Sequence, residues 1–139
     1  MNPINLMLST FSGGGKLDSD DMKPVQDLFK ESVAAWNRGD IDGYLHCYAG
    51  LETVRYISGG KIIIGKAAIA AEFKSRFPTP DLMGTLSMKR LEIDKITPTD
   101  ALFYGEFQLV REGIVSSGVF TGHMQKFSAG WALVLDHSS

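Results

Sequence analysis

Two ionisable residues, Asp136 and His137, stand side by side near the end of the sequence, in "GWALVLDHSS". Carboxylates and imidazoles are among the groups that most often move protons in enzymes. Successive side chains of a strand point to opposite faces of the sheet, so these two residues cannot pair with each other. At most one of them therefore faces the interior of the protein.

The hairpin that precedes this strand decides which of the two faces inward. A three-residue loop at 128–130 sets Asp136 beside Gly122, on the face of Phe120 and Met124, and a two-residue loop turns His137 to that face instead. An inward Asp136 would lie among phenylalanines, where loss of water raises its pKa and suits it to acid–base catalysis. The alternative is that Asp136 only accepts a hydrogen bond from a hydroxyl or a backbone N–H. An outward His137 suits an interface with a second subunit.

Three further residues are candidates for a binding site. Tyr56 and Ser58, in "TVRYIS", are expected to offer hydroxyls to a ligand, and Tyr56 is the second candidate catalytic residue. Trp36 ends the apolar stripe of a predicted helix, where it packs in the core or lines a pocket. The alternative for Tyr56 is a half-buried strand aromatic.

The sequence lacks the residue patterns typical of metal sites, disulfides, catalytic serines and phosphate-binding loops. The three histidines show no HxxxH or HxH spacing, and the single Cys47 excludes both an intrachain disulfide and a cysteine-rich zinc site. There is no G-x-S-x-G serine elbow, and the glycine-rich stretches lack the context of a phosphate loop. We therefore expect neither a metal nor a cofactor.

Composition excludes two classes of partner and indicates one domain. The 139 residues carry a net charge of −2 without a basic run, so no nucleic acid is expected. No apolar run approaches the ~18 residues of a membrane span. Residues 1–20 are expected to form a flexible tail and residues 21–139 a single domain. We expect a cytoplasmic protein, with a trimmed export signal as the alternative.

Hydrophobic spacing predicts three helices followed by strands. An amphipathic helix begins at Lys23, a short one lies within 41–49, and a third follows Gly65. Between the last two, a hairpin turns at Gly59 and Gly60. From residue 85 onward, four long strands form an antiparallel meander. These elements predict an α+β fold.

Strand parity predicts that the meander is strongly curved. A two-residue turn at 112–113 would set Phe103 opposite Gly122 and Gly105 opposite Phe120. In "TLSMKRLEIDKI" the apolar positions switch parity, which a one-residue bulge near 89–90 would explain. Bulges and glycines bend sheets.

This order of elements resembles the cone-shaped fold of the nuclear transport factor 2-like superfamily, and within it the SnoaL-like group. The resemblance covers nearly the whole chain from Lys23. The stretches that carry it are "AWNRGDIDGYLHCYA", "SGGKIIIGKAAI", "RFPTPDLMGTL" and "GWALVLDHSS". It implies three helices packed in the concave side of a strongly curved, mainly antiparallel sheet.

The resemblance also implies a homodimer through the sheet and a conical pocket. It favours the register that turns Ala132, Val134, Asp136 and Ser138 inward. The ligand-binding residues expected from it and from strand parity are Trp36, Tyr56, Ser58, Phe103, Phe107, Phe120, Met124 and Asp136. Steroid isomerases of the superfamily use an Asp base and a Tyr, and the matching positions here hold Tyr56 and Ser32. That arrangement of catalytic groups is therefore absent.

Three functions follow from these expectations. The first is a homodimeric protein whose hydrophobic pocket binds a small, largely apolar molecule. The second is an isomerase, dehydratase or cyclase that uses Asp136 as general acid and base, with Tyr56 as hydrogen-bond donor. The third is an oligomerisation module. Members of the superfamily perform all three, so the resemblance leaves open whether the chain is an enzyme.

Overall fold

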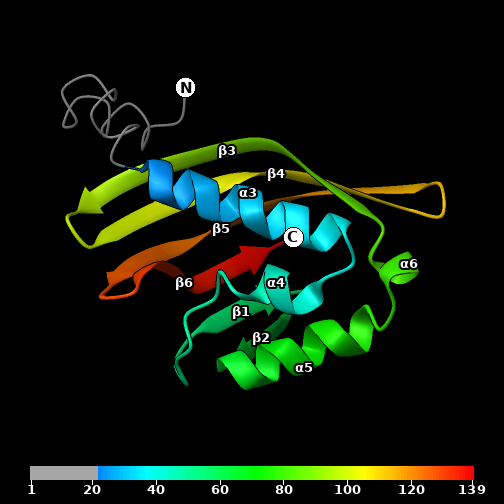
Figure 1. Cartoon of the computed structure of the whole chain (residues 1–139), viewed down its shortest axis with the longest axis horizontal. Helices are drawn as coiled ribbons and strands as arrows, with labels where there is room; N and C mark the ends of the chain where they lie inside the picture. Colours follow the sequence, from blue (N-terminus) through cyan, green and yellow to red (C-terminus); the bar gives the residue numbers. More distant parts are fainter. Residues whose placement is uncertain (1–21) are drawn as a thin grey trace.

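The computed structural model describes residues 22–139, and the tail expected at residues 1–20 lies outside this part. Figure 1 shows its helices packed against one side of a six-stranded sheet. The elements, in chain order, are α3 (Lys23–Asn37), α4 (Ile41–Leu45), β1 (Arg55–Ser58), β2 (Lys61–Ile64), α5 (Lys66–Arg76), α6 (Pro80–Met83), β3 (Thr85–Thr97), β4 (Asp100–Arg111), β5 (Ile114–Phe127) and β6 (Gly130–Ser138).

The sheet joins the short hairpin to the long meander through one parallel contact. Its strand order is β2-β1-β6-β5-β4-β3, and every neighbouring pair is antiparallel except β1 and β6. In that parallel pair Tyr56 lies opposite Asp136. The sheet is therefore mixed, and the two candidate catalytic residues are neighbours across it.

Two predicted tight turns are confirmed. Gly59 and Gly60 join β1 to β2 with φ of 58° and 79°, a region that glycine adopts without steric cost. Glu112 and Gly113 join β4 to β5, again with both φ values positive. Turns of this kind match the twist of the strands they connect.

The second turn sets the predicted aromatic and glycine pairs in register. Phe103 lies opposite Gly122, and Gly105 lies opposite Phe120. The two rings approach each other to 6.0 Å between centroids. A side chain on either glycine would collide with a ring and with the backbone of the next strand, so these glycines allow the rings to lie flat on the sheet.

The predicted bulge in β3 is confirmed, but strong curvature of the sheet is not. The register shifts between Met88 and Arg90, where the apolar positions change parity. Figure 1 shows β3 and β4 as long, gently bent strands rather than strands curled around a cone. A bulge adds bend at one point of an edge strand, and here it does not curl the whole sheet.

Within residues 22–139 there are four helices, where we predicted three, and only α3 and α5 exceed five residues. The additional helix, α6, begins at Pro80, the last residue of "PTP". Thr79 accepts a hydrogen bond from the Leu82 amide. Pro80 lies in the first turn, where a backbone N–H would have no acceptor within the helix, so proline loses no hydrogen bond there. Pro78 thus follows the end of α5, and Pro80 begins α6.

The core lies between the helices and the face of the sheet toward them, which we call the inner face. α3 buries the predicted stripe, including Val25, Phe29 and Trp36, and α5 buries Ile69 and Phe73. Within the part of the chain described, no helix has the length and apolar composition to cross a membrane.

Candidate functional site

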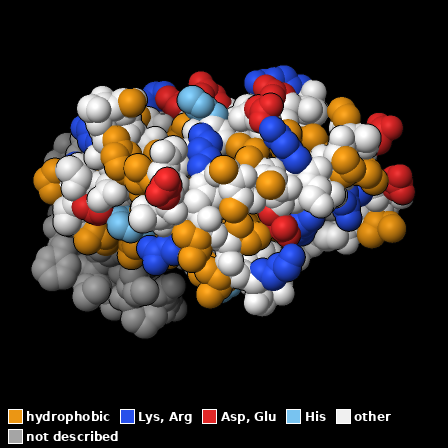
Figure 2. Space-filling model, turned by 90° about the horizontal axis from the view of Figure 1, so that it is seen from below, with side chains coloured by type: hydrophobic (Ala, Val, Ile, Leu, Met, Phe, Trp, Pro, Cys, Tyr) orange, Lys and Arg blue, Asp and Glu red, His pale blue; other side chains and the backbone are white. Residues whose placement is uncertain are grey.

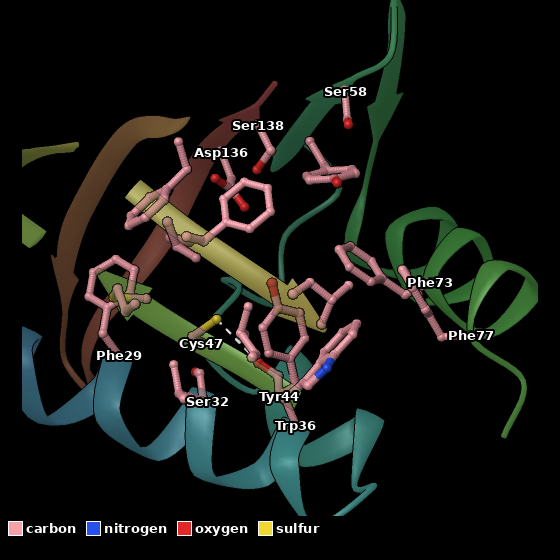
Figure 3. Close-up of a pocket in the computed structure, with 18 of the residues that line it drawn as sticks. Phe29, Ser32, Trp36, Tyr44, Cys47, Ser58, Phe73, Phe77, Asp136 and Ser138 are labelled. Atoms are coloured by element: carbon pink, nitrogen blue, oxygen red, sulfur yellow. Dashed lines mark hydrogen bonds between the residues drawn. The ribbon is translucent and has the colours of Figure 1, made fainter. Parts of the chain in front are cut away.

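A cavity of about 190 Å³ lies between the helices and the inner face of the sheet. Its wall combines side chains of α3, α5 and the segment after α4 with inner-facing side chains of β1, β3, β4, β5 and β6. Figure 3 shows aromatic rings around most of this space, with Asp136 on one side of it. An apolar cavity with a few polar groups is the usual form of a small-molecule site.

Asp136 reaches the cavity by a route that we did not predict. The β5–β6 loop has two residues, because Phe127 pairs with Gly130 rather than with Trp131. The register shifts between His123 and Met124, which pair with Leu135 and Leu133, so Val134 is an extra residue in β6. After this residue, the even-numbered side chains of β6 face inward. Asp136 therefore lies beside Gly122, as predicted, even though the loop is the one expected to turn His137 to the inner face.

The two-residue loop also corrects two other residues that we predicted to face inward. Leu133, with 3% of its side chain exposed, faces the cavity in place of Ala132 and Val134. Val134 instead contributes to a shallow groove beside His123 on the opposite, outer face of the sheet. Ser138 lies in the cavity wall, as expected.

Asp136 is a buried carboxylate with one hydrogen-bond donor among residues 22–139. Its Oδ2 accepts a hydrogen bond of 2.6 Å from the Tyr48 hydroxyl. No residue from 22 to 139 donates a hydrogen bond to its Oδ1. Burial raises the pKa of Asp136 from 3.8 to about 6, although the Tyr48 bond and nearby His137 lower it. Asp136 can therefore both release and accept a proton near neutral pH.

The part of the cavity wall formed by α3 and the segment after α4 includes Ser32 and Cys47. Both are buried, and the Cys47 thiol donates to the backbone oxygen of Tyr44 at 3.2 Å. Burial raises the pKa of Cys47 to about 12, so it is a neutral thiol rather than a nucleophilic thiolate. Burial also holds the pKa of the Tyr44 hydroxyl well above 10.

One wall of the cavity is an aromatic cluster from α3, α4 and α5. Trp36 packs edge-on against Tyr44 and Phe77, with ring centroids 4.8 Å and 4.9 Å away. Phe73 lies 5.0 Å from Tyr56, which brings β1 into the same cluster. The Trp36 indole donates a 2.9 Å hydrogen bond to the backbone oxygen of Met83, so its ring is fixed in place.

The structure brings six of the eight predicted ligand-binding residues to the cavity. Those in its wall are Trp36, Tyr56, Ser58, Phe107, Phe120 and Asp136. Phe103 and Met124 share their sheet face, but they are covered by core packing and do not line the cavity. Phe29 of α3 contacts the Phe103 ring at 5.1 Å and covers it.

Sequence reasoning missed Tyr48, Phe73, Phe77 and Arg76. Phe73 and Phe77 are four residues apart, so they share one side of the α5 segment, and this spacing was visible in "EFKSRF". Tyr48 lies after α4 and forms a bridge to Leu133 of β6, which no local pattern indicates.

The histidines lie away from the cavity. His137 is exposed, and His123 pairs through Nε2 with Asp100 Oδ1 at 2.7 Å on the outer face. The hydroxyls of Thr97 and Thr99 also donate to Asp100, and these bonds lower its pKa. Among residues 22–139 no three His, Cys, Asp or Glu side chains lie close enough to hold a metal ion.

Solved structures share this fold, although no protein-family profile matches the sequence and no curated protein does. The chain is 32% identical to a nuclear transport factor 2-like protein of unknown function from Shewanella oneidensis MR-1, with a TM-score of 0.82 over 86% of this chain and 98% of that one. The chain therefore belongs to the nuclear transport factor 2-like superfamily. None of these comparisons names the SnoaL-like group, which stays a prediction.

More distant structures share the fold alone. A nuclear transport factor 2-like protein of unknown function from Pseudomonas putida KT2440 is 16% identical, with a TM-score of 0.71 and 87% of each chain covered. A ketosteroid isomerase-like protein from Erwinia carotovora atroseptica is 15% identical, with a TM-score of 0.66 over 86% of this chain and 95% of that one.

Proposed function

We propose that this protein binds a small, largely apolar molecule in the cavity beside Asp136. The observation that carries the proposal is a mostly apolar cavity in which one carboxylate oxygen of Asp136 has no hydrogen-bond donor among residues 22–139. Close packing leaves few voids in protein interiors, so an apolar space of this size between helices and sheet is a candidate ligand site. A hydroxyl or amide group of the ligand would donate a hydrogen bond to Asp136 Oδ1. The aromatic rings of the wall would contact the apolar part of the ligand.

A cavity-filling substitution tests this function. We expect Ser138→Trp to place an indole in the cavity and to weaken binding of an apolar fluorescent probe by about tenfold or more. His137→Trp is the matched control, because it puts the same side chain on the next residue of β6, where it is exposed. Equal binding by both variants and the unchanged protein would refute the proposal.

Acid–base catalysis by Asp136 is the second candidate function. It is supported by a pKa near 6 and by the position of Tyr56 opposite Asp136 in the parallel strand pair. We expect the protein to exchange the α-protons of small cyclic ketones in heavy water, measured by proton NMR, and Asp136→Asn to abolish that exchange. Asp81→Asn, on α6, is the control. Exchange that survives Asp136→Asn would exclude this role.

We also propose that the protein is a homodimer that associates through the outer face of its sheet. Four apolar side chains of this face are exposed by 41% to 65%: Ile62, Ile64, Leu102 and Val119. Each neighbours an inward residue of its own strand, so all four point away from the helices. Figure 2 shows the molecule from the side of α5 and β2, where surface hydrophobic groups alternate with charged ones.

A further inference from the structure

A cationic side chain that is exposed to solvent contributes to the mostly apolar wall of the cavity. Arg76, at the end of α5, is the one Lys or Arg in the part of the wall that residues 22–139 form. Its guanidinium carbon lies 5.3 Å from the ring centroid of Phe77, and that of Arg111 lies 5.4 Å from the same centroid. The two arginines therefore share one aromatic ring at the α5 side of the cavity.

Neither arginine has a carboxylate partner among residues 22–139. Other basic side chains of this part are within 4.0 Å of an Asp or Glu, among them Lys23, Arg38, Lys61, Lys74 and Arg90. Arg111 donates instead to the backbone oxygen of Leu82 at 3.1 Å, which holds it beside the ring. The positive charge at this side of the cavity is thus available to an anion.

The remaining wall limits the size and the orientation of a ligand. An apolar cavity of about 150 Å³ accepts benzene, and this one measures about 190 Å³, so it suits a body of roughly one ring. Asp136 and Phe77 lie on different sides of the space in Figure 3. A negative group would be repelled by ionised Asp136 and attracted by Arg76, so it would point toward α5.

We propose that the cavity binds a small carboxylic acid with a body of about one ring, whose carboxylate pairs with Arg76. Arginine and carboxylate groups match in geometry and form strong, charge-assisted hydrogen bonds. The ring of the ligand lies among Trp36, Phe73 and Phe77. Arg111 adds positive charge on the side of the cavity where Arg76 lies. This inference rests on the proposed small-molecule function and specifies the chemical class of its ligand.

Calorimetric titration of the full chain with two matched probes tests the inference. The probes are 3-phenylpropanoate and its amide, 3-phenylpropanamide, which share one ring and one chain length and differ in charge. We expect the acid to bind about tenfold more tightly than the amide, because only the acid forms an ion pair with Arg76.

Variants of α5 then assign the effect to one side chain. Arg76→Gln should weaken binding of the acid by about tenfold and leave binding of the amide within about twofold. Arg76→Lys should restore part of the loss, because the charge returns without the planar fork. Lys74→Gln is the control: it removes the same charge two residues away, from a side chain outside the cavity wall.

Two outcomes would overturn the inference, and they separate it from the proposed function. If acid and amide bind equally, or if Arg76→Gln and Lys74→Gln have equal effects, the acid preference is wrong while the apolar cavity still binds ligands. If neither probe binds and Ser138→Trp leaves the binding of an apolar fluorescent probe unchanged, both proposals fail.

Discussion

Asp136 is the residue at which burial and chemistry are most closely linked. Its side chain is 7% exposed, it faces an apolar cavity, and the Tyr48 hydroxyl is its one hydrogen-bond donor among residues 22–139. The loss of water favours the neutral acid, which accounts for the rise of its pKa to about 6. A group of this kind reduces stability wherever folding must keep it ionised.

We expect the stability cost of Asp136 to depend on pH. Below its ordinary pKa of 3.8, Asp136 is protonated in both the folded and unfolded chain and costs nothing. Between 3.8 and about 6 the unfolded chain ionises first, so the free energy of unfolding falls as pH rises. Above about 6 the full cost, on the order of 3 kcal/mol, is present.

The Asp136→Asn substitution removes the ionisable group, and with it this pH dependence of the free energy of unfolding. Denaturant unfolding of both proteins across the pH range from acid to neutral should show that the variant gains stability relative to the unchanged protein as pH rises. A difference that stays constant with pH would contradict the raised pKa of Asp136.

At the scale of elements, paired aromatics and glycines shape the inner face of β4 and β5. A Cβ on Gly105 would meet the backbone oxygen of Arg90 on β3 and, at 2.6 Å, the Phe120 ring. The backbone oxygen cannot move without breaking the strand pairing. Glycine is therefore required at this position by close approach rather than by its φ angle.

We expect Gly105→Ala to destabilise the protein by about 3 kcal/mol, because the added methyl group must displace the backbone of β3 or the Phe120 ring. Gly50→Ala is the control, since a Cβ there would have no neighbour within 4 Å and Gly50 is outside the positive-φ glycines. Its change should stay within about 0.5 kcal/mol. The midpoints of urea unfolding measure both effects, and equal midpoints for the two variants would contradict the packing argument.

At the scale of the whole molecule, the two faces of the sheet have different environments. The inner face is covered by helices and encloses the cavity, while the outer face exposes Leu102 on β4 and Val119 on β5. Apolar side chains that gather on one uncovered sheet face favour association with a second protein surface. This contrast supports the proposed homodimer.

We expect the protein to sediment at twice its mass of 15.2 kDa at micromolar concentration. Val119→Glu should shift it toward the monomer, because a carboxylate would be buried in the interface without a partner. Leu82→Glu, an exposed apolar position on α6, should leave the mass unchanged. A monomer in the unchanged protein would rule out both the dimer and the oligomerisation module.

Local patterns in the sequence determined most of the elements of this protein. The stripe of α3, the Gly59–Gly60 and Glu112–Gly113 turns, the parity switch in β3 and the pairing of Phe103 with Gly122 were all predicted and are present. Each depends on residues close in the chain or on one short turn, so periodicity and turn chemistry are sufficient to predict it.

The tertiary structure alone decided how Asp136 is placed. The two-residue loop before β6 would by itself have turned Asp136 outward, and the register shift near Val134 reverses this. Leu133 is held at that point by backbone hydrogen bonds of 2.8 Å with Cys47 and Ala49, which lie more than eighty residues earlier in the chain. The same segment brings Tyr48 to Asp136. Contacts between segments so far apart leave no local pattern, so the site chemistry depends on how the chain packs.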